Sequence, residues 1–104
     1  MELEEIKTLL KNTGLPVAFR AFQDLQKPPF LCWLIPYERG ISADNINYVD
    51  IKSLQIELYT SQKDVEMENK VQLALTGAGL FYEKTQVYIT EEKVYQTIYE
   101  TEVL

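Results

Sequence analysis

The sequence contains no histidine and a single cysteine, Cys32. Without histidine, the chain lacks the commonest general base and the commonest metal ligand, and every catalytic triad that uses an imidazole is excluded. One cysteine cannot form a disulfide within the chain. Because Cys32 lies in an apolar segment and has no histidine to activate it, we expect a small buried hydrophobic side chain and not a nucleophile.

Clustered positive charge is also missing. Ten lysine and arginine residues stand against sixteen aspartate and glutamate residues, which gives a formal net charge of −6. Without a basic cluster to bind phosphates, sequence-specific binding of nucleic acid is not expected. An acidic surface would instead suit a channel through which DNA slides, because like charges repel.

Long apolar runs are absent as well. No segment reaches the length of a membrane span, so we expect no membrane partner. The acidic, amphipathic residues 1–11 do not have the pattern of a signal peptide. Together with the single cysteine, these features favour a cytosolic protein.

Acidic pairs and glycine motifs predict no reactive site either. Asp64 and Glu68 are four residues apart on one expected helix face, but hard cations need more oxygen ligands than two carboxylates supply. Acids in a first helical turn favour the helix dipole. Gly77-Ala78-Gly79 follows a helix and does not open one, so it does not fit a phosphate-binding loop. We therefore predict no catalytic residues, no cofactor and no metal.

The stretch from Tyr48 to Gly79 organises the rest of the chain. Residues 48–59 have the pattern of a long strand without glycine or proline. Ser61 is the expected N-cap of a helix, with Asp64 three residues later, and Gly77 or Gly79 is the expected C-cap. The apolar stripe of this helix consists of Met67, Val71, Ala74, Leu75 and Ala78.

The apolar phase of the long strand changes near Lys52-Ser53. Val49 and Ile51 occupy odd positions, whereas the apolar residues from Leu54 onward occupy even positions. Side chains alternate between the two faces of a sheet, so this slip indicates either a β-bulge or two halves that face different partners. In the second case the first half leaves the core and contacts another subunit.

The remaining segments complete one domain over residues 1–104. A helix is predicted at Glu2–Asn12, strands at Val17–Phe22, Phe30–Tyr37, Leu80–Ile89 and Val94–Val103, and a long irregular loop at Glu38–Asn47, which is either solvated or ordered by a partner. The order α-β-β-β-α-β-β predicts an α+β fold. We expect a mixed or antiparallel sheet of about five strands with both helices packed on it.

The chain contains seven tyrosines. Tyr82 and Tyr88 share one strand face, and so do Tyr95 and Tyr99, which predicts either cross-strand aromatic pairs or contacts with another protein. Val65 and Leu73 lie on the helix side away from its apolar stripe. Together these residues suggest a contact between subunits.

Several segments are informative through their order. They are Pro36-Tyr37, Ser42-Ala43-Asp44-Asn45, Ile56-Glu57-Leu58-Tyr59-Thr60, Lys63-Asp64, a helix with Glu66, Glu68, Lys70 and Val71, Gly79-Leu80-Phe81-Tyr82-Glu83-Lys84, and Val94-Tyr95-Gln96-Thr97-Ile98-Tyr99-Glu100. This order resembles the small tail terminator proteins, also called tail-completion or head-tail joining proteins, of long-tailed phages and prophages of Gram-positive bacteria. The resemblance extends over nearly the whole chain, from the first helix to the last strand.

The resemblance implies a structural protein and not an enzyme. Copies of such a protein assemble as a hexameric ring on the tail tube, stop tube polymerisation and present a surface to the head connector, while DNA passes through the opening. The implied partners are other copies of the chain, the major tail tube protein and the head connector. The implied locations are the bacterial cytoplasm during assembly and then the virion tail.

The residues predicted to make these contacts fall into two sets. Arg39, Asp44, Asn45 and Tyr48 are predicted to contact partners, and Tyr82, Tyr88 and Tyr95, with Val65 and Leu73, to pack between subunits. The alternative is a small α+β ligand-binding or regulatory domain, which predicts a closed apolar pocket with convergent polar groups.

Overall fold

The computed structural model describes the backbone of residues 1–43 and 47–104 and the side chains of residues 1–40 and 50–104. Its elements are α1 (Leu3–Lys11), β1 (Val17–Phe19), β2 (Phe30–Ala43), β3 (Asn47–Thr60), α2 (Val65–Gly77), β4 (Tyr82–Ile89) and β5 (Val94–Val103). The five strands form one sheet in the order β1-β2-β3-β5-β4, with β1 parallel to β2 and the other neighbours antiparallel. The predicted α+β fold, its element order and its mixed sheet are confirmed.

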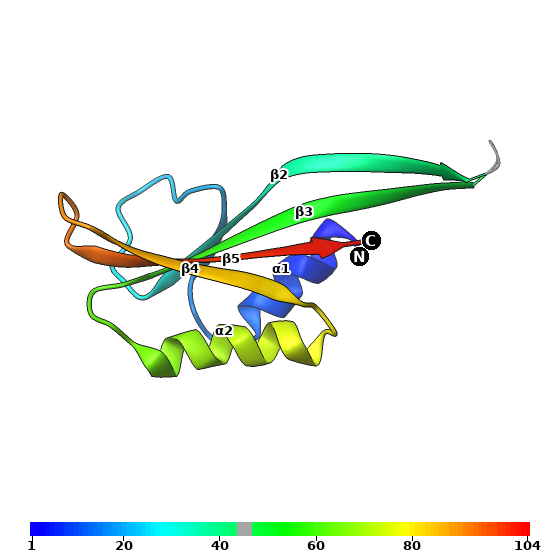
Figure 1. Ribbon diagram of the computed structural model, residues 1–104. Coiled ribbons are helices and arrows are strands. Elements are labelled where there is room, and N and C mark those ends of the chain that lie inside the picture. The colour runs from blue at the N-terminus through cyan, green and yellow to red at the C-terminus, as the bar shows by residue number, and fades with distance from the viewer. Residues whose placement is uncertain (44–46) are drawn as a thin grey trace.

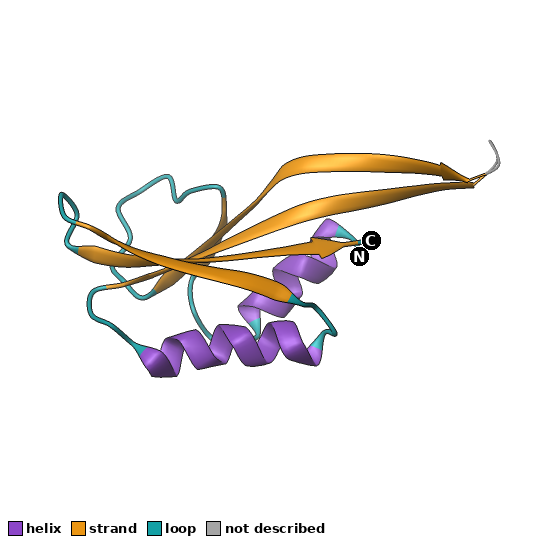
Figure 2. Cartoon of the chain, in the orientation of Figure 1, coloured by secondary structure: helices purple, strands orange, loops and turns teal. Residues whose placement is uncertain are grey.

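Both helices cover the same face of the sheet (Figure 1, Figure 2). The core lies between them and this face. Its fully buried apolar members are Ile6 and Leu10 of α1, Leu31 of β2, Leu54, Ile56 and Leu58 of β3, Val71 and Leu75 of α2, and Tyr99 of β5. The side chains of residues 54–60 alternate between buried and half-buried positions, as expected when one face of a strand packs on the core.

The ends of α2 follow from local hydrogen bonds. The side chain of Asp64 accepts a hydrogen bond from the backbone N–H of Met67 at 3.2 Å, so Asp64 is the N-cap. The prediction of Ser61 as N-cap is wrong, because the helix begins only after Asp64. At the other end, Gly79 has a φ of 75°, and the N–H groups of Gly79 and Leu80 donate to the carbonyls of Thr76 and Leu75. These two bonds form a Schellman motif, which selects Gly79 as the glycine that ends the helix.

Strands β2 and β3 are longer than predicted. They pair from Phe30↔Tyr59 to Ala43↔Asn47, so the irregular loop predicted at Glu38–Asn47 is wrong for residues 38–43 and for Asn47. The turn-forming residues there adopt extended backbone because each lies opposite a residue of the neighbouring strand. In contrast, β1 ends at Phe19, before the predicted Phe22, because Arg20 has a φ of 67° and leaves the strand.

The irregularity predicted in β3 lies in its neighbour β2. Leu34 is paired with Gln55 and Tyr37 with Ser53, so Ile35 and Pro36 both lie opposite Leu54. Pro36 has no N–H to donate, which suits it to such a bulge. From Lys52 onward β3 also pairs with β5, whereas its earlier residues pair with β2 alone in the described part of the chain.

The two glycines near the end of α2 allow a matched test of this cap. Gly79→Ala forces a Cβ into the left-handed region and is expected to lower the free energy of unfolding by about 1–2 kcal/mol. Gly77→Ala, at a helical position where an added Cβ meets no atom within 4 Å, is expected to raise it by about 0.5 kcal/mol. Urea unfolding followed by circular dichroism measures both. Equal effects of the two substitutions would contradict the assigned cap.

Candidate functional site

The end of the β2–β3 pair projects from the body of the protein (Figure 1). Strand β5 ends at Val103, opposite Lys52, and the two-stranded segment beyond it, residues 39–43 with 47–51, is here called the projecting ribbon. It gives the molecule its elongated dimensions of 50 × 26 × 22 Å. A two-stranded ribbon is marginally stable by itself in water, and unpaired strand edges bind other chains. The projecting ribbon is therefore the first candidate interaction surface.

The contact residues predicted near this ribbon have different surroundings. The Arg39 guanidinium Nη2 lies 3.4 Å from Oε2 of Glu102 on β5, and 49% of its side chain remains exposed. An exposed ion pair stabilises a fold little, so Arg39 can exchange its contact with Glu102 for a contact with a partner at little cost in stability. The backbone of Tyr48 pairs with Ser42 inside the ribbon. Asp44, Asn45 and the side chain of Tyr48 lie outside the described residues.

The predicted aromatic residues separate into two groups. Tyr88 and Tyr95 are directly opposite each other on β4 and β5, with ring centroids 4.9 Å apart, so the predicted cross-strand aromatic pair is present. Tyr88 is exposed and Tyr95 half-buried. Tyr82 instead packs edge-on against the buried Tyr99, with centroids 5.4 Å apart, and belongs to the rim of the core.

Val65 and Leu73 are both exposed on α2. Val65 is the first residue of the helix, at the end of the molecule where the β4–β5 turn also lies (Figure 1). Leu73 lines a shallow hollow between the helices together with Leu9 and Ala74. The structure thus brings Tyr88 and Tyr95 together but distributes the other predicted contact residues over separate elements.

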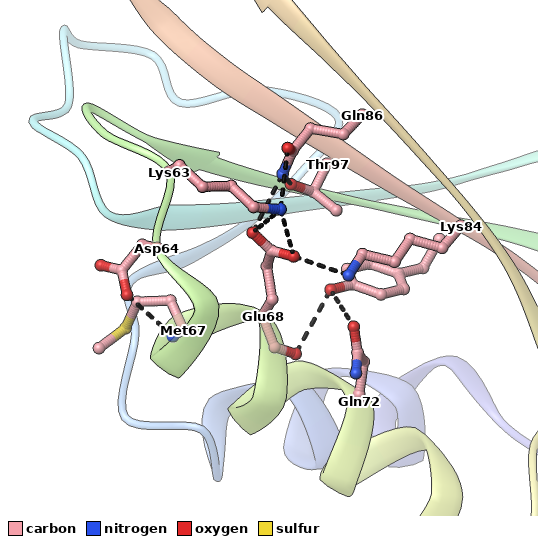
Figure 3. A network of polar contacts seen from close by, with 9 residues as sticks. Lys63, Asp64, Met67, Glu68, Gln72, Lys84, Gln86 and Thr97 are labelled. Atoms are coloured by element: carbon pink, nitrogen blue, oxygen red, sulfur yellow. Dashed lines mark hydrogen bonds and ion pairs between the residues drawn. The ribbon is translucent and has the colours of Figure 1, made fainter.

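A buried carboxylate, which sequence reasoning missed, fixes α2 to the sheet (Figure 3). Glu68 is only 2% exposed. Its Oε1 accepts a hydrogen bond from Lys84 Nζ at 2.6 Å, and its Oε2 lies 2.9 Å from Lys63 Nζ and 3.1 Å from Gln86 Nε2. Gln86 Nε2 also donates to the hydroxyl of Thr97 at 2.7 Å, so the network joins the helix to both β4 and β5.

The balance of forces on Glu68 favours its charged form. Burial by itself raises the pKa of a carboxyl group, but the hydrogen bonds from Lys84, Lys63 and Gln86 outweigh it and hold the pKa of Glu68 below its ordinary value. The spacing of Glu68, Val71 and Leu75, at i, i+3 and i+7, is the sequence signal that places this carboxylate on the core side of the helix.

Removing this charge is expected to destabilise the protein in a pH-dependent way. Glu68→Gln should lower the free energy of unfolding by about 2 kcal/mol at pH 7, because charged hydrogen bonds are lost. The folded pKa lies below the ordinary value of 4.5, so the wild-type advantage is fully present above pH 4.5 and declines as the pH falls through the lowered pKa. Urea unfolding from pH 7 to pH 3 measures this difference.

Glu66→Gln is the matched control for this prediction. Glu66 lies in the same first turn but is exposed, so its substitution is expected to change stability by no more than about 0.5 kcal/mol. A Glu68→Gln variant as stable as the Glu66→Gln variant at pH 7 would contradict the role assigned to the network.

The loop between β1 and β2 borders a surface hollow of about 650 Å³, here called the loop hollow. Its aromatic lining is stacked: the rings of Phe30 and Tyr59 have centroids 4.8 Å apart, and Phe22 packs edge-on against Phe30. The hydroxyl of Tyr59 donates to Glu57 Oε1 at 3.1 Å and accepts from Gln96 Nε2 at 2.8 Å. These bonds hold the Tyr59 ring in place against Phe30.

Cys32 also lines the loop hollow. Burial, with the nearby charge of Glu57, raises the pKa of the Cys32 thiol to about 11. The thiol is therefore protonated at neutral pH, and the thiolate is the nucleophilic form. Cys32 thus behaves as a small apolar side chain in the lining, as expected from the sequence.

Among the residues that the structure describes, no group of three or more acidic or cysteine side chains is arranged to hold a metal ion. Within the same residues, no helix is long and apolar enough to cross a membrane. The chain matches no family model, and a search of curated proteins gives no match.

Proposed function

We propose that this protein is a structural subunit of a phage or prophage particle, a tail terminator or head-tail joining protein. Copies of the chain form a ring, hexameric in the particle, on the last ring of the tail tube. The ring covers the surface that another tube subunit would use, and its outer face docks on the head connector. The protein acts in the bacterial cytoplasm during assembly and remains in the virion tail.

The main support for this proposal is the projecting ribbon. Within the described residues, the backbone of the ribbon pairs only between β2 and β3. The ribbon also extends beyond the helices that cover the sheet (Figure 2). A segment with so little support from its own core is stabilised when an adjacent protein covers it or adds a strand to its edge. Such a segment fits a protein that functions inside an assembly.

The charge of the chain supports the same role. A net charge of −6 suits the wall of a channel, because DNA that slides past acidic groups does not bind to them. The resemblance to tail terminators, noted for the sequence, includes the segment Pro36-Tyr37. In the structure Pro36 lies in the bulge of β2, and the projecting ribbon begins shortly after it, at Arg39.

The proposed contacts use two parts of the surface. Arg39, Asp44, Asn45 and Tyr48 belong to the segment that includes the ribbon and are assigned to the tube or connector. Tyr88 and Tyr95, with Val65 at the same end of the molecule and Leu73 and Tyr82 elsewhere, are assigned to packing between subunits. Tyrosines with part of the ring exposed suit such interfaces because each ring offers an apolar area and a polar tip.

The role is tested by disrupting the gene in the phage or prophage that encodes the chain. If the protein stops tube growth, electron microscopy should show tails of irregular length and heads without attached tails. Restoring the gene in trans should restore complete particles. Normal particles in the disrupted strain would contradict the proposal.

A ribbon-shortened variant tests the part played by the ribbon. Replacing residues 41–49 by Asn-Gly joins Gly40 to Asp50, which are directly opposite each other, through a two-residue turn. Because the core lies elsewhere, the change in the free energy of unfolding is expected to stay within about 1 kcal/mol. The variant should nevertheless fail to restore complete particles. Full restoration by this variant would show that the ribbon is not needed.

A further inference from the structure

Phe81 is a large apolar side chain presented to solvent on a fixed backbone. It is 95% exposed and lies between α2 and β4. On one side, the N–H of Leu80 donates to the carbonyl of Leu75 in the helix cap. On the other, the carbonyl of Phe81 itself accepts a hydrogen bond from the hydroxyl of Thr101. The backbone that carries the ring is therefore held in place, which lowers the entropy lost when a partner binds this segment.

The surface next to Phe81 is acidic. Glu83 and Glu100 are directly opposite each other on β4 and β5, and Glu102 follows on the same surface. Like charges in directly opposed positions destabilise a sheet. Within the described residues, Glu102 is paired with Arg39, whereas Glu83 and Glu100 have no cationic partner. A positively charged partner surface would relieve this repulsion.

The loop hollow combines aromatic and charged residues. Phe22, Phe30 and Tyr59 line it, and the charged members of its lining, here called its rim, are two basic residues, Arg20 and Lys27, and two acidic residues, Asp24 and Glu92. The two basic residues are the ones that can pair with Glu83 and Glu100. Arg20 is a non-glycine residue with a φ of 67°, and its N–H donates to the carbonyl of Trp33 at 2.8 Å. Residues held in this strained region are frequent at binding sites.

The two features lie at opposite ends of the sheet. Phe81 precedes the first residue of β4, whereas the hollow includes Glu92 and Val94, which follow its last residue. The eight residues of β4 separate them by roughly 26 Å of extended chain. A contact between these two ends of different copies is head-to-tail, the geometry that generates rings when the rotation closes.

We infer that Phe81 of one copy inserts into the loop hollow of a second copy, with Glu83 and Glu100 facing Arg20 and Lys27. This contact rests on the proposed ring function, for which it supplies one subunit interface. One aromatic side chain and two exposed ion pairs bury less than the roughly 800 Å² per partner of a standard interface. The contact is therefore weak in isolation and is strengthened by closure of a ring and by partner proteins.

Self-association of the purified full chain tests the contact. Sedimentation velocity at low salt, with protein concentrations up to about 1 mM, reaches contacts with millimolar dissociation constants. The wild-type chain should show a rising average mass. Phe81→Ala should weaken the association at least about tenfold, as expected for a central aromatic contact. Leu3→Ala is the matched control, because Leu3 is also exposed, at 47%, but lies on α1.

Charge reversal tests the pairing itself. Arg20→Glu with Lys27→Glu makes the rim acidic, and Glu83→Lys with Glu100→Lys makes the surface near Phe81 basic. Each double variant should fail to self-associate, because like charges then meet. A mixture of the two double variants should associate, since the basic Phe81 surface of one fits the acidic rim of the other. Circular dichroism confirms that both variants are folded.

The inference is overturned by several results. They are an unchanged association of the Phe81→Ala variant, a mixture that stays monomeric, or a wild-type chain that is monomeric at about 1 mM. A monomeric chain whose melting temperature is raised by small aromatic acids would instead assign the loop hollow to a ligand. If gene disruption yields defective tails but Phe81→Ala restores them fully, the ring function stands and this contact is wrong. Normal particles after gene disruption would reject the ring function instead.

Discussion

The ion pairs of Glu68 determine where α2 lies on the sheet. The apolar contacts of Val71 and Leu75 supply much of the buried surface of this helix, but apolar packing tolerates small shifts. A carboxylate removed from water is stable only when directed partners replace its hydration, and Lys84, Lys63 and Gln86 provide them. The helix is thereby fixed in one position on the sheet.

The architecture could be predicted from the sequence because burial on one face of a strand or helix leaves a periodic pattern. This pattern is seen in the even-numbered apolar residues from Leu54 to Leu58 and in the apolar stripe of α2. The pattern is uninformative where no core is present. Residues 38–43 contain glycine and serine, which locally favour a turn, yet pairing with β3 keeps them extended. The bulge was predicted in β3 but lies in β2, because a shift in register can come from an extra residue in either strand of a pair.

The surface was predictable only in part. The tyrosine alternation indicated the Tyr88–Tyr95 pair, but the sequence could not tell that Tyr82 packs on Tyr99, because this depends on the register of β4 on β5, which places Tyr82 opposite Thr101. Glu68 was overlooked since an acid in a first helical turn already has a local explanation in the helix dipole. The proposed contact between Phe81 of one copy and the loop hollow of another can be recognised only from the structure, in which β4 separates these two features.

The bulge at Ile35 and Pro36 divides strand β2 into two parts under different structural constraints. Before it, the side chains of Leu31 and Trp33 are buried in the core, so few substitutions are tolerated. Beyond it, the described backbone of β2 pairs with β3, so the sequence there is constrained by this pairing and by any partner that binds the ribbon. Changes of sequence or length in the projecting ribbon leave the packing of the body intact. Descendants of one ancestral scaffold can therefore acquire new recognition properties there without losing the ability to fold.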